Sequence, residues 1–212
     1  PADVFDAVVD GVRTMISTAL LLVAVGIIIN VVTTTGIGNA FSLMIVEWAQ
    51  GSLFITLVLV ALASLVLGMG LPVTASYIVL ATLSAPLIYD LISQSALLDA
   101  ILIGIQAGDL PNNVAATLSL FGGDPLIALQ EMPLEMKQLI RQEMLPAELL
   151  TGMLLSAHLI IFWLSQDSNV TPPVCLASFA AAGIAGTNPM ATGLTSWKVA
   201  KGLYLVPILF AY

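Results

Sequence analysis

Two segments rich in glycine, proline and oxygen-bearing side chains interrupt the long apolar stretches of this chain. The first, residues 68–72 (Gly-Met-Gly-Leu-Pro), lies inside residues 48–89, which contain no Asp, Glu, Lys or Arg. The second, residues 167–173 (Asp-Ser-Asn-Val-Thr-Pro-Pro), lies inside residues 149–197, where Asp167 is the single charge. Lipid requires a partner for every backbone N–H and C=O group, so such breaks need cover from protein or from a water-filled cavity. Paired, interrupted apolar segments are typical of binding sites in secondary transporters.

The first break could bind an ion or a carboxylate through its backbone. Gly68 and Gly70 permit a ligand to approach the backbone closely, and Pro72 suits the first turn of the returning helix. A helix that ends here offers carbonyl groups to a cation, and the helix that follows offers N–H groups to a carboxylate. A tight turn at the membrane surface would use the same residues, and these residues alone leave both interpretations open.

The second break offers more oxygen atoms to a cation. Its tandem prolines remove two N–H donors and thereby free carbonyl groups, and Ser168, Asn169 and Thr171 add side-chain oxygens of the kind that bind hard cations. Asp167 at membrane depth would be costly, which makes it a functional candidate. The flanking apolar segments are also long enough to form two spans joined by an ordinary loop, in which Asp167 would be solvated.

His158 precedes Asp167 by nine residues and is the only histidine. It could relay protons, but a hydrogen-bonded interior histidine, or one that faces a cavity, is the favoured interpretation. A hydrolase that uses His158 and Asp167 inside the membrane is the least favoured function, because no spacing of nucleophile and base indicates catalysis. No His or Cys cluster predicts zinc and no phosphate loop predicts ATP. We therefore expect no enzyme, and no cofactor besides a coupling ion.

Composition favours an integral membrane protein. Of 212 residues, 59% are hydrophobic and 8% are charged, whereas soluble domains carry about 25% charged residues. The net charge of −8 and the lack of a basic patch argue against nucleic acid as a partner. The five Lys and Arg residues determine orientation only weakly. The chain begins with Pro1 and stops within an apolar run too short to span, so we expect a fragment of a longer polypeptide.

The pattern predicts an all-α fold with four regions. Residues 1–50 should hold an entry helix, a first span and an amphipathic helix, and residues 51–89 a helical hairpin. Residues 90–148 contain most of the loop carboxylates and should form a polar, amphipathic insertion outside the membrane. Residues 149–212 should hold a broken helix, a connecting helix and a truncated last span.

The hairpin is predicted to be re-entrant because its arms are short. Residues 53–67 and 73–88 give arms of roughly 22 Å each, against a hydrocarbon core of roughly 30 Å. Two tilted full spans remain open if neighbouring residues extend the arms. Residues 89–108 are ambiguous. Further helices are expected over residues 1–13, 14–32, 39–50, 134–144, 149–166, 174–186 and 190–201, with the last span starting near Gly202.

Several motifs together resemble the large membrane subunit of tripartite ATP-independent periplasmic (TRAP) transporters, closest to the fused permease type. Residues 68–81 (Gly-Met-Gly-Leu-Pro-Val-Thr-Ala-Ser-Tyr-Ile-Val-Leu-Ala) are similar to its hairpin motif. Residues 169–174 (Asn-Val-Thr-Pro-Pro-Val), followed by 181–186, are similar to its second broken helix, and residues 33–38 and 188–190 also fit. The resemblance extends over nearly the whole chain and is weakest in the insertion.

The resemblance implies one repeat, the C-terminal one, of an inverted-repeat transporter of the elevator type. It implies a multi-pass protein of the bacterial or archaeal cytoplasmic (inner) membrane that imports organic acids, driven by a sodium gradient. The implied partners are a periplasmic substrate-binding protein, a small membrane subunit or its fused equivalent, the remaining half of the permease, a carboxylate substrate and the lipid bilayer. A membrane scaffold or assembly subunit without its own transport site is the alternative from another class.

The hairpin tip and the broken helix would be the sodium and substrate elements of this half. The implied substrate-binding residues are Gly70, Pro72, Thr74, Asn169 and Thr171. The candidate Na⁺ region comprises Gly68, Gly70, Ser168, Thr171 and Pro172. Asp167 and Ser168 depart from the small apolar residues that many relatives have before the Thr-Pro-Pro motif, a difference that could alter the choice of ion.

Overall fold

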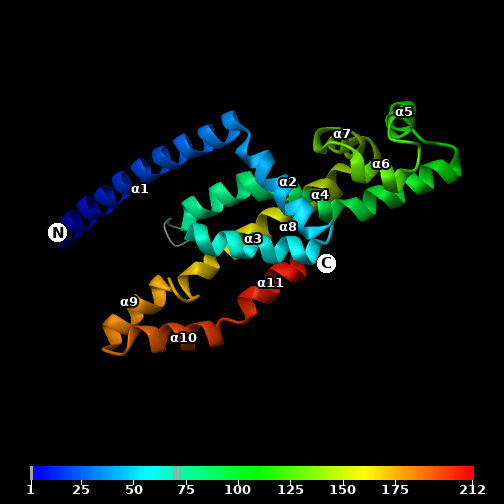
Figure 1. Cartoon of the computed structure of the whole chain (residues 1–212). Coiled ribbons are helices and arrows are strands. Elements are labelled where there is room, and N and C mark those ends of the chain that lie inside the picture. Colours follow the sequence, from blue (N-terminus) through cyan, green and yellow to red (C-terminus); the bar gives the residue numbers. More distant parts are fainter. Residues whose placement is uncertain (1, 69–70, 72) are drawn as a thin grey trace.

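The computed structural model describes residues 2–68, 71 and 73–212, and in these residues the chain is helical without strands (Figure 1). The α-helices α1 to α11 and one short 3₁₀ helix, η1, follow one another along the chain. Their bounds are α1 Ala2–Thr35, α2 Ile37–Ala49, α3 Leu53–Gly68, α4 Val73–Ala107, α5 Asn112–Leu120, α6 Pro125–Glu131, α7 Leu134–Met144, α8 Ala147–Gln166, η1 Asp167–Asn169, α9 Leu176–Ala185, α10 Pro189–Val199 and α11 Gly202–Ala211.

The N-terminal region forms one long helix, not the two that its pattern predicts. α1 continues through the expected boundary between residues 13 and 14, because no proline occurs there to interrupt its backbone hydrogen bonds. It ends at Thr35, and the next residue, Gly36, has a φ of 70° in the left-handed region. The amphipathic helix expected over 39–50 is confirmed as α2, with Trp48 exposed. Figure 1 shows α1 extending away from the other helices.

The second arm of the hairpin is much longer than predicted. α3 ends at Gly68 as expected, but α4 does not end near residue 88. It has 35 residues, which gives about 52 Å, more than a bilayer core of roughly 30 Å. Pro86 lies inside the helix without ending it. Residues 89–107 of the ambiguous segment are therefore the second half of α4, and no helix end lies at residue 89.

α4 connects two separate hydrophobic cores. Its first half packs with α3 and α8, where Val60, Leu80 and Ile161 are fully buried. Its second half packs with α5, α6 and α7 through Leu97, Ile101 and Leu129. Of the insertion predicted over 90–148, residues 90–107 belong to α4, and α5, α6 and α7 form a helical cap on the far end of that helix (Figure 1). The amphipathic helix predicted over 134–144 is confirmed as α7.

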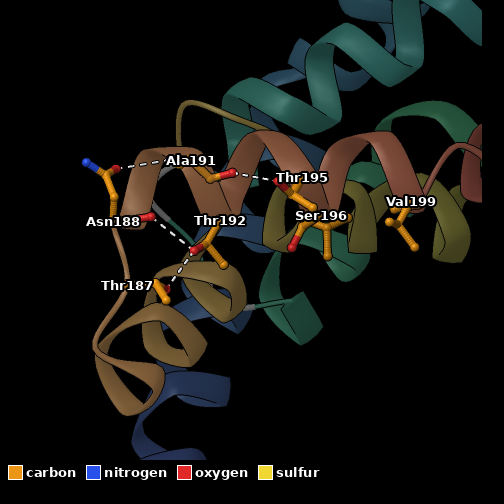
Figure 2. Close-up of a pocket in the computed structure, with 9 residues that line it drawn as sticks. Thr187, Asn188, Ala191, Thr192, Thr195, Ser196 and Val199 are labelled. Atoms are coloured by element: carbon orange, nitrogen blue, oxygen red, sulfur yellow. Dashed lines mark hydrogen bonds between the residues drawn. The ribbon is translucent and has the colours of Figure 1, made fainter.

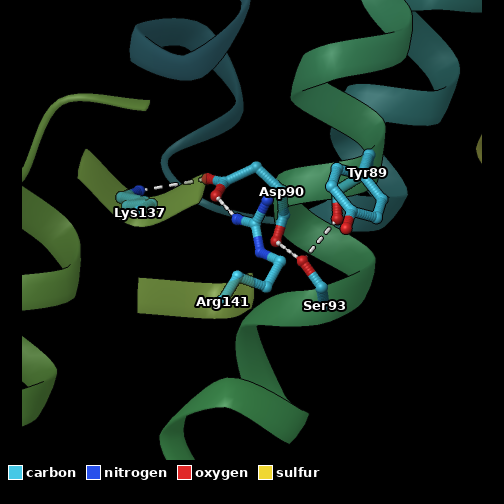
Figure 3. A network of polar contacts seen from close by, with 5 residues as sticks. All are labelled: Tyr89, Asp90, Ser93, Lys137 and Arg141. Carbon is cyan, nitrogen blue, oxygen red and sulfur yellow. Dashed lines mark hydrogen bonds and ion pairs between the residues drawn. The ribbon is translucent and has the colours of Figure 1, made fainter. Parts of the chain in front are cut away.

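A buried group of ions joins the cap to α4 (Figure 3). Asp90, on α4, is 5% exposed and forms ion pairs with Arg141 and, at 3.0 Å, with Lys137 of α7. The Arg141 guanidinium also lies 4.7 Å from the centre of the Tyr89 ring. Two counter-charges compensate the carboxylate, which permits α4 to continue past Asp90, beyond the arm expected over residues 73–88.

The predicted broken helix is confirmed. α8 ends at Gln166, η1 follows, and the apolar helix resumes as α9 at Leu176. α9 packs against α10, and α11 returns to pack along α8. Among the described residues, two helices, Val73–Ala107 and Ala147–Asn169, are long and apolar enough to cross a membrane, and Leu53–Gly68 and Leu176–Ala185 are shorter apolar helices.

Candidate functional site

The end of α3 packs against the broken helix, which brings the two sequence breaks together. The Ser64 hydroxyl donates a buried hydrogen bond of 2.8 Å to the Leu164 carbonyl in the last turn of α8. One turn further along α3, Gly68 lies against Ser168 so closely that an added Cβ would overlap the serine side chain. A glycine is therefore required at position 68 for this approach.

The chain at the second break leaves carbonyl groups without helical donors. The backbone N–H groups of Val170 and Thr171 both donate to the Asp167 carbonyl, at 3.2 and 2.9 Å. The next two residues are prolines and have no N–H, so the carbonyls four residues earlier, of Ser168 and Asn169, lack the donor that a continuous helix supplies. Ser168 is 5% exposed. The break thus has oxygen atoms for a cation close to Gly68.

Thr171 contacts a residue that the sequence does not predict. Its hydroxyl is hydrogen-bonded to the Tyr204 hydroxyl of α11. Together with Asp167, these two residues line a cavity of about 300 Å³ whose other walls are apolar side chains of α3, α8 and α11. Tyr204 lies 33 residues beyond Thr171, and no local pattern in the sequence indicates that the two meet.

Asp167 is the most unusual group at this site. Asp167 is 3% exposed, and its Oδ1 atom has no hydrogen-bond partner within the described part of the chain. Asp167 is therefore buried, contrary to the solvated side chain that the loop alternative predicted. A buried charged group without a partner is costly, and such groups are found where a ligand or ion binds.

The remaining predicted site residues are less closely connected. Thr74 is exposed in the first turn of α4, and Asn169 and Pro172 are half-buried at the break. Gly70 and Pro72 lie outside the described residues. The structure therefore brings Gly68 to Ser168 and Asp167 to Thr171, and it leaves the grouping of the other candidates a prediction.

His158 belongs to a different part of the molecule from Asp167. Its Nδ1 atom is 3.1 Å from the Tyr77 hydroxyl, and it lines a cavity of about 410 Å³ with residues of α4 and α7. Nine residues on a helix turn through about 900°, which places the two side chains on opposite faces. The favoured interpretation of a hydrogen-bonded histidine that faces a cavity is confirmed, and the pairing with Asp167 for catalysis is not supported.

A third cavity, of about 550 Å³, lies along α10 and includes Val170 of the second break. Thr192, Thr195 and Ser196 occupy one face of the helix there (Figure 2). The Thr192 and Thr195 hydroxyls donate to carbonyls one turn earlier, at 3.0 and 2.9 Å. The helical spacing of these hydroxyl groups could have been found from the sequence. The two threonine hydroxyls, however, donate their hydrogen bonds within α10.

One comparison with known proteins decides the family. Residues 2–212 match the family model described as the DctM component of the tripartite ATP-independent periplasmic transporter. The chain belongs to the DctM family. The resemblance carried by the two breaks is thereby confirmed at the level of the TRAP permease, which is a membrane transporter component and not an enzyme. Neither the curated proteins nor the solved structures gave a significant match.

Proposed function

We propose that this DctM chain supplies the C-terminal repeat, of the fused permease type, in a TRAP transporter that imports organic acids with a sodium gradient. The observation that carries the proposal is the close contact of Gly68 with Ser168, which joins the end of α3 to the broken helix. Two helix ends that meet at membrane depth provide the unpaired backbone groups from which transporters build ion and substrate sites.

The sodium ion is assigned to the junction of α3 and η1. The carbonyls of Ser168 and Asn169 lack helical donors, and the Ser168 side chain lies against Gly68. Oxygen atoms of this kind are the ligands that hard cations prefer. Gly70, Thr171 and Pro172 complete the proposed Na⁺ region, and the carboxyl end of α3 adds a partial negative charge.

The substrate carboxylate is assigned to the start of α4, because a helix N-terminus carries a partial positive charge. α4 begins at Val73, and the N–H groups of its first turn, including that of Thr74, favour an anion. Gly70, Pro72, Asn169 and Thr171 are the further substrate candidates. The other half of the permease would supply the rest of the site by an inverted repeat and would move with this one as an elevator.

The family supplies the context for the proposed partners. TRAP permeases work with a periplasmic binding protein and a small membrane subunit. We propose the same partners here, the small subunit in fused form, and a multi-pass location in the inner membrane. The long, exposed apolar helix α1 is a surface suited to lipid or to the remaining membrane segments.

Gly68→Ala in the complete transporter tests the sodium assignment. An added Cβ overlaps Ser168 and would displace the proposed sodium ligands. We therefore expect the sodium concentration that gives half-maximal uptake of an organic acid to rise about tenfold or more. Gly152→Ala on α8 is the matched control, because an added Cβ there meets nothing within 4 Å. Wild-type sodium dependence in Gly68→Ala would contradict the assignment and favour a scaffold role.

A further inference from the structure

The cavity beside the second break is large enough for an organic ligand. It has a volume of about 300 Å³ and lies between α3, the end of α8 and α11. Leu57, Ala61 and Ile208 are among the apolar side chains that form its walls. This volume is at the lower end of the range for small-molecule sites, so the cavity suits a small, partly apolar molecule.

One carboxyl group without a counter-charge lies at the polar end of this cavity. Asp167 is 3% exposed and its Oδ1 atom has no partner, while the hydroxyls of Thr171 and Tyr204 bind each other. None of the described residues that line the cavity is Lys or Arg. Burial of a carboxylate without a counter-charge costs several kcal/mol, and a bound cation would offset that cost.

We propose that this cavity binds a primary ammonium ion carried by a short apolar chain. The ammonium group donates to the carboxylate of Asp167, and its other N–H groups donate to lone pairs on the hydroxyls of Thr171 and Tyr204, which accept as well as donate. The alkyl chain packs against the walls from α3 and α11. An inorganic cation would neutralise the carboxylate but would leave those walls uncovered. This site goes beyond the proposed function. It shares Thr171 with the proposed Na⁺ and substrate residues, but the proposal is carried by the cavity and by the buried Asp167.

The test uses the complete transporter in lipid nanodiscs and the probe pentylammonium chloride. Because a ligand that binds only the folded state stabilises it by mass action, pentylammonium should raise the unfolding temperature with a saturable dependence. Two comparison probes, 1-pentanol and tetramethylammonium chloride at equal concentration, should not raise it. All measurements are made at one fixed, saturating sodium chloride concentration, so that the proposed Na⁺ site stays occupied throughout. In Asp167→Asn the half-saturating concentration should rise about tenfold or more, as expected for loss of a buried charged hydrogen bond.

Two further variants separate binding from folding and from partition into lipid. Asp99→Asn changes an exposed carboxylate on α4 and should leave the half-saturating concentration unchanged. Ala61→Leu keeps Asp167 but fills part of the cavity, and it should weaken pentylammonium binding. The proposal is overturned if pentanol stabilises equally, if tetramethylammonium chloride stabilises equally, or if Asp167→Asn and Ala61→Leu both bind pentylammonium as the wild type does.

Discussion

Two buried aspartates in this chain have opposite surroundings. Asp90 is 5% exposed and forms ion pairs with Lys137 and Arg141, at the joint between α4 and the cap. Asp167 is 3% exposed at the end of α8, and one of its oxygens has no partner in the described structure. Burial alone therefore does not indicate function. The compensated carboxylate holds two parts of the fold together, and the uncompensated one is the place where we propose a ligand.

Removal of the compensated charge should have the largest effect. Asp90→Asn leaves Arg141 and Lys137 buried or half-buried without their carboxylate, so we expect a loss of about 3–5 kcal/mol in the free energy of unfolding. Titration of the purified transporter with a denaturing detergent measures this loss.

A triple variant serves as the control for Asp90→Asn. Asp90→Leu with Lys137→Leu and Arg141→Met removes all three charges, so it should recover much of the stability, because well-packed apolar side chains often replace buried ion pairs without cost. If Asp90→Asn were as stable as the wild type, the ion group would not hold the cap to α4.

Substitution of Asp167 should change the free energy of unfolding less than substitution of Asp90, and in the opposite direction. Asp167→Asn relieves a buried carboxylate that lacks a counter-charge, so we expect the free energy of unfolding to stay the same or to rise by about 1 kcal/mol. The same detergent titration, carried out in parallel with Asp90→Asn, measures the difference. A loss as large as that of Asp90→Asn would show that Asp167 is also compensated and would remove the contrast between the two residues.

The hydrogen bond that joins the two breaks should contribute least. Ser64→Ala removes the 2.8 Å bond to the Leu164 carbonyl, and we expect a loss of about 1 kcal/mol. Ser95→Ala, an exposed position on α4, is the matched control and should change stability very little. A loss for Ser64→Ala no larger than the control would mean that α3 and α8 are held by apolar packing alone.

The local elements were predictable because their patterns are local. The tandem prolines predicted the interruption of α8, and the acidic, proline-containing stretch predicted the short helices of the cap. The full length of the second arm was not predicted: the arm was expected over residues 73–88, and α4 continues past the charge of Asp90. Its partners, Lys137 and Arg141, follow 47 and 51 residues later, too far along the chain for a local pattern to pair them.

The features of the candidate site also divide into those that local sequence predicted and those that only the packing of distant residues decided. The sequence by itself determined that two glycine- and proline-containing breaks interrupt apolar helices, and their residue types predicted ion and carboxylate chemistry. Only the tertiary structure decided that Gly68 meets Ser168, that Thr171 binds Tyr204, and that Asp167 is buried without a counter-charge. The reason is physical: backbone breaks depend on residues next to one another, whereas the compensation of a buried charge depends on which distant side chains the packing of α3, α8 and α11 brings near it.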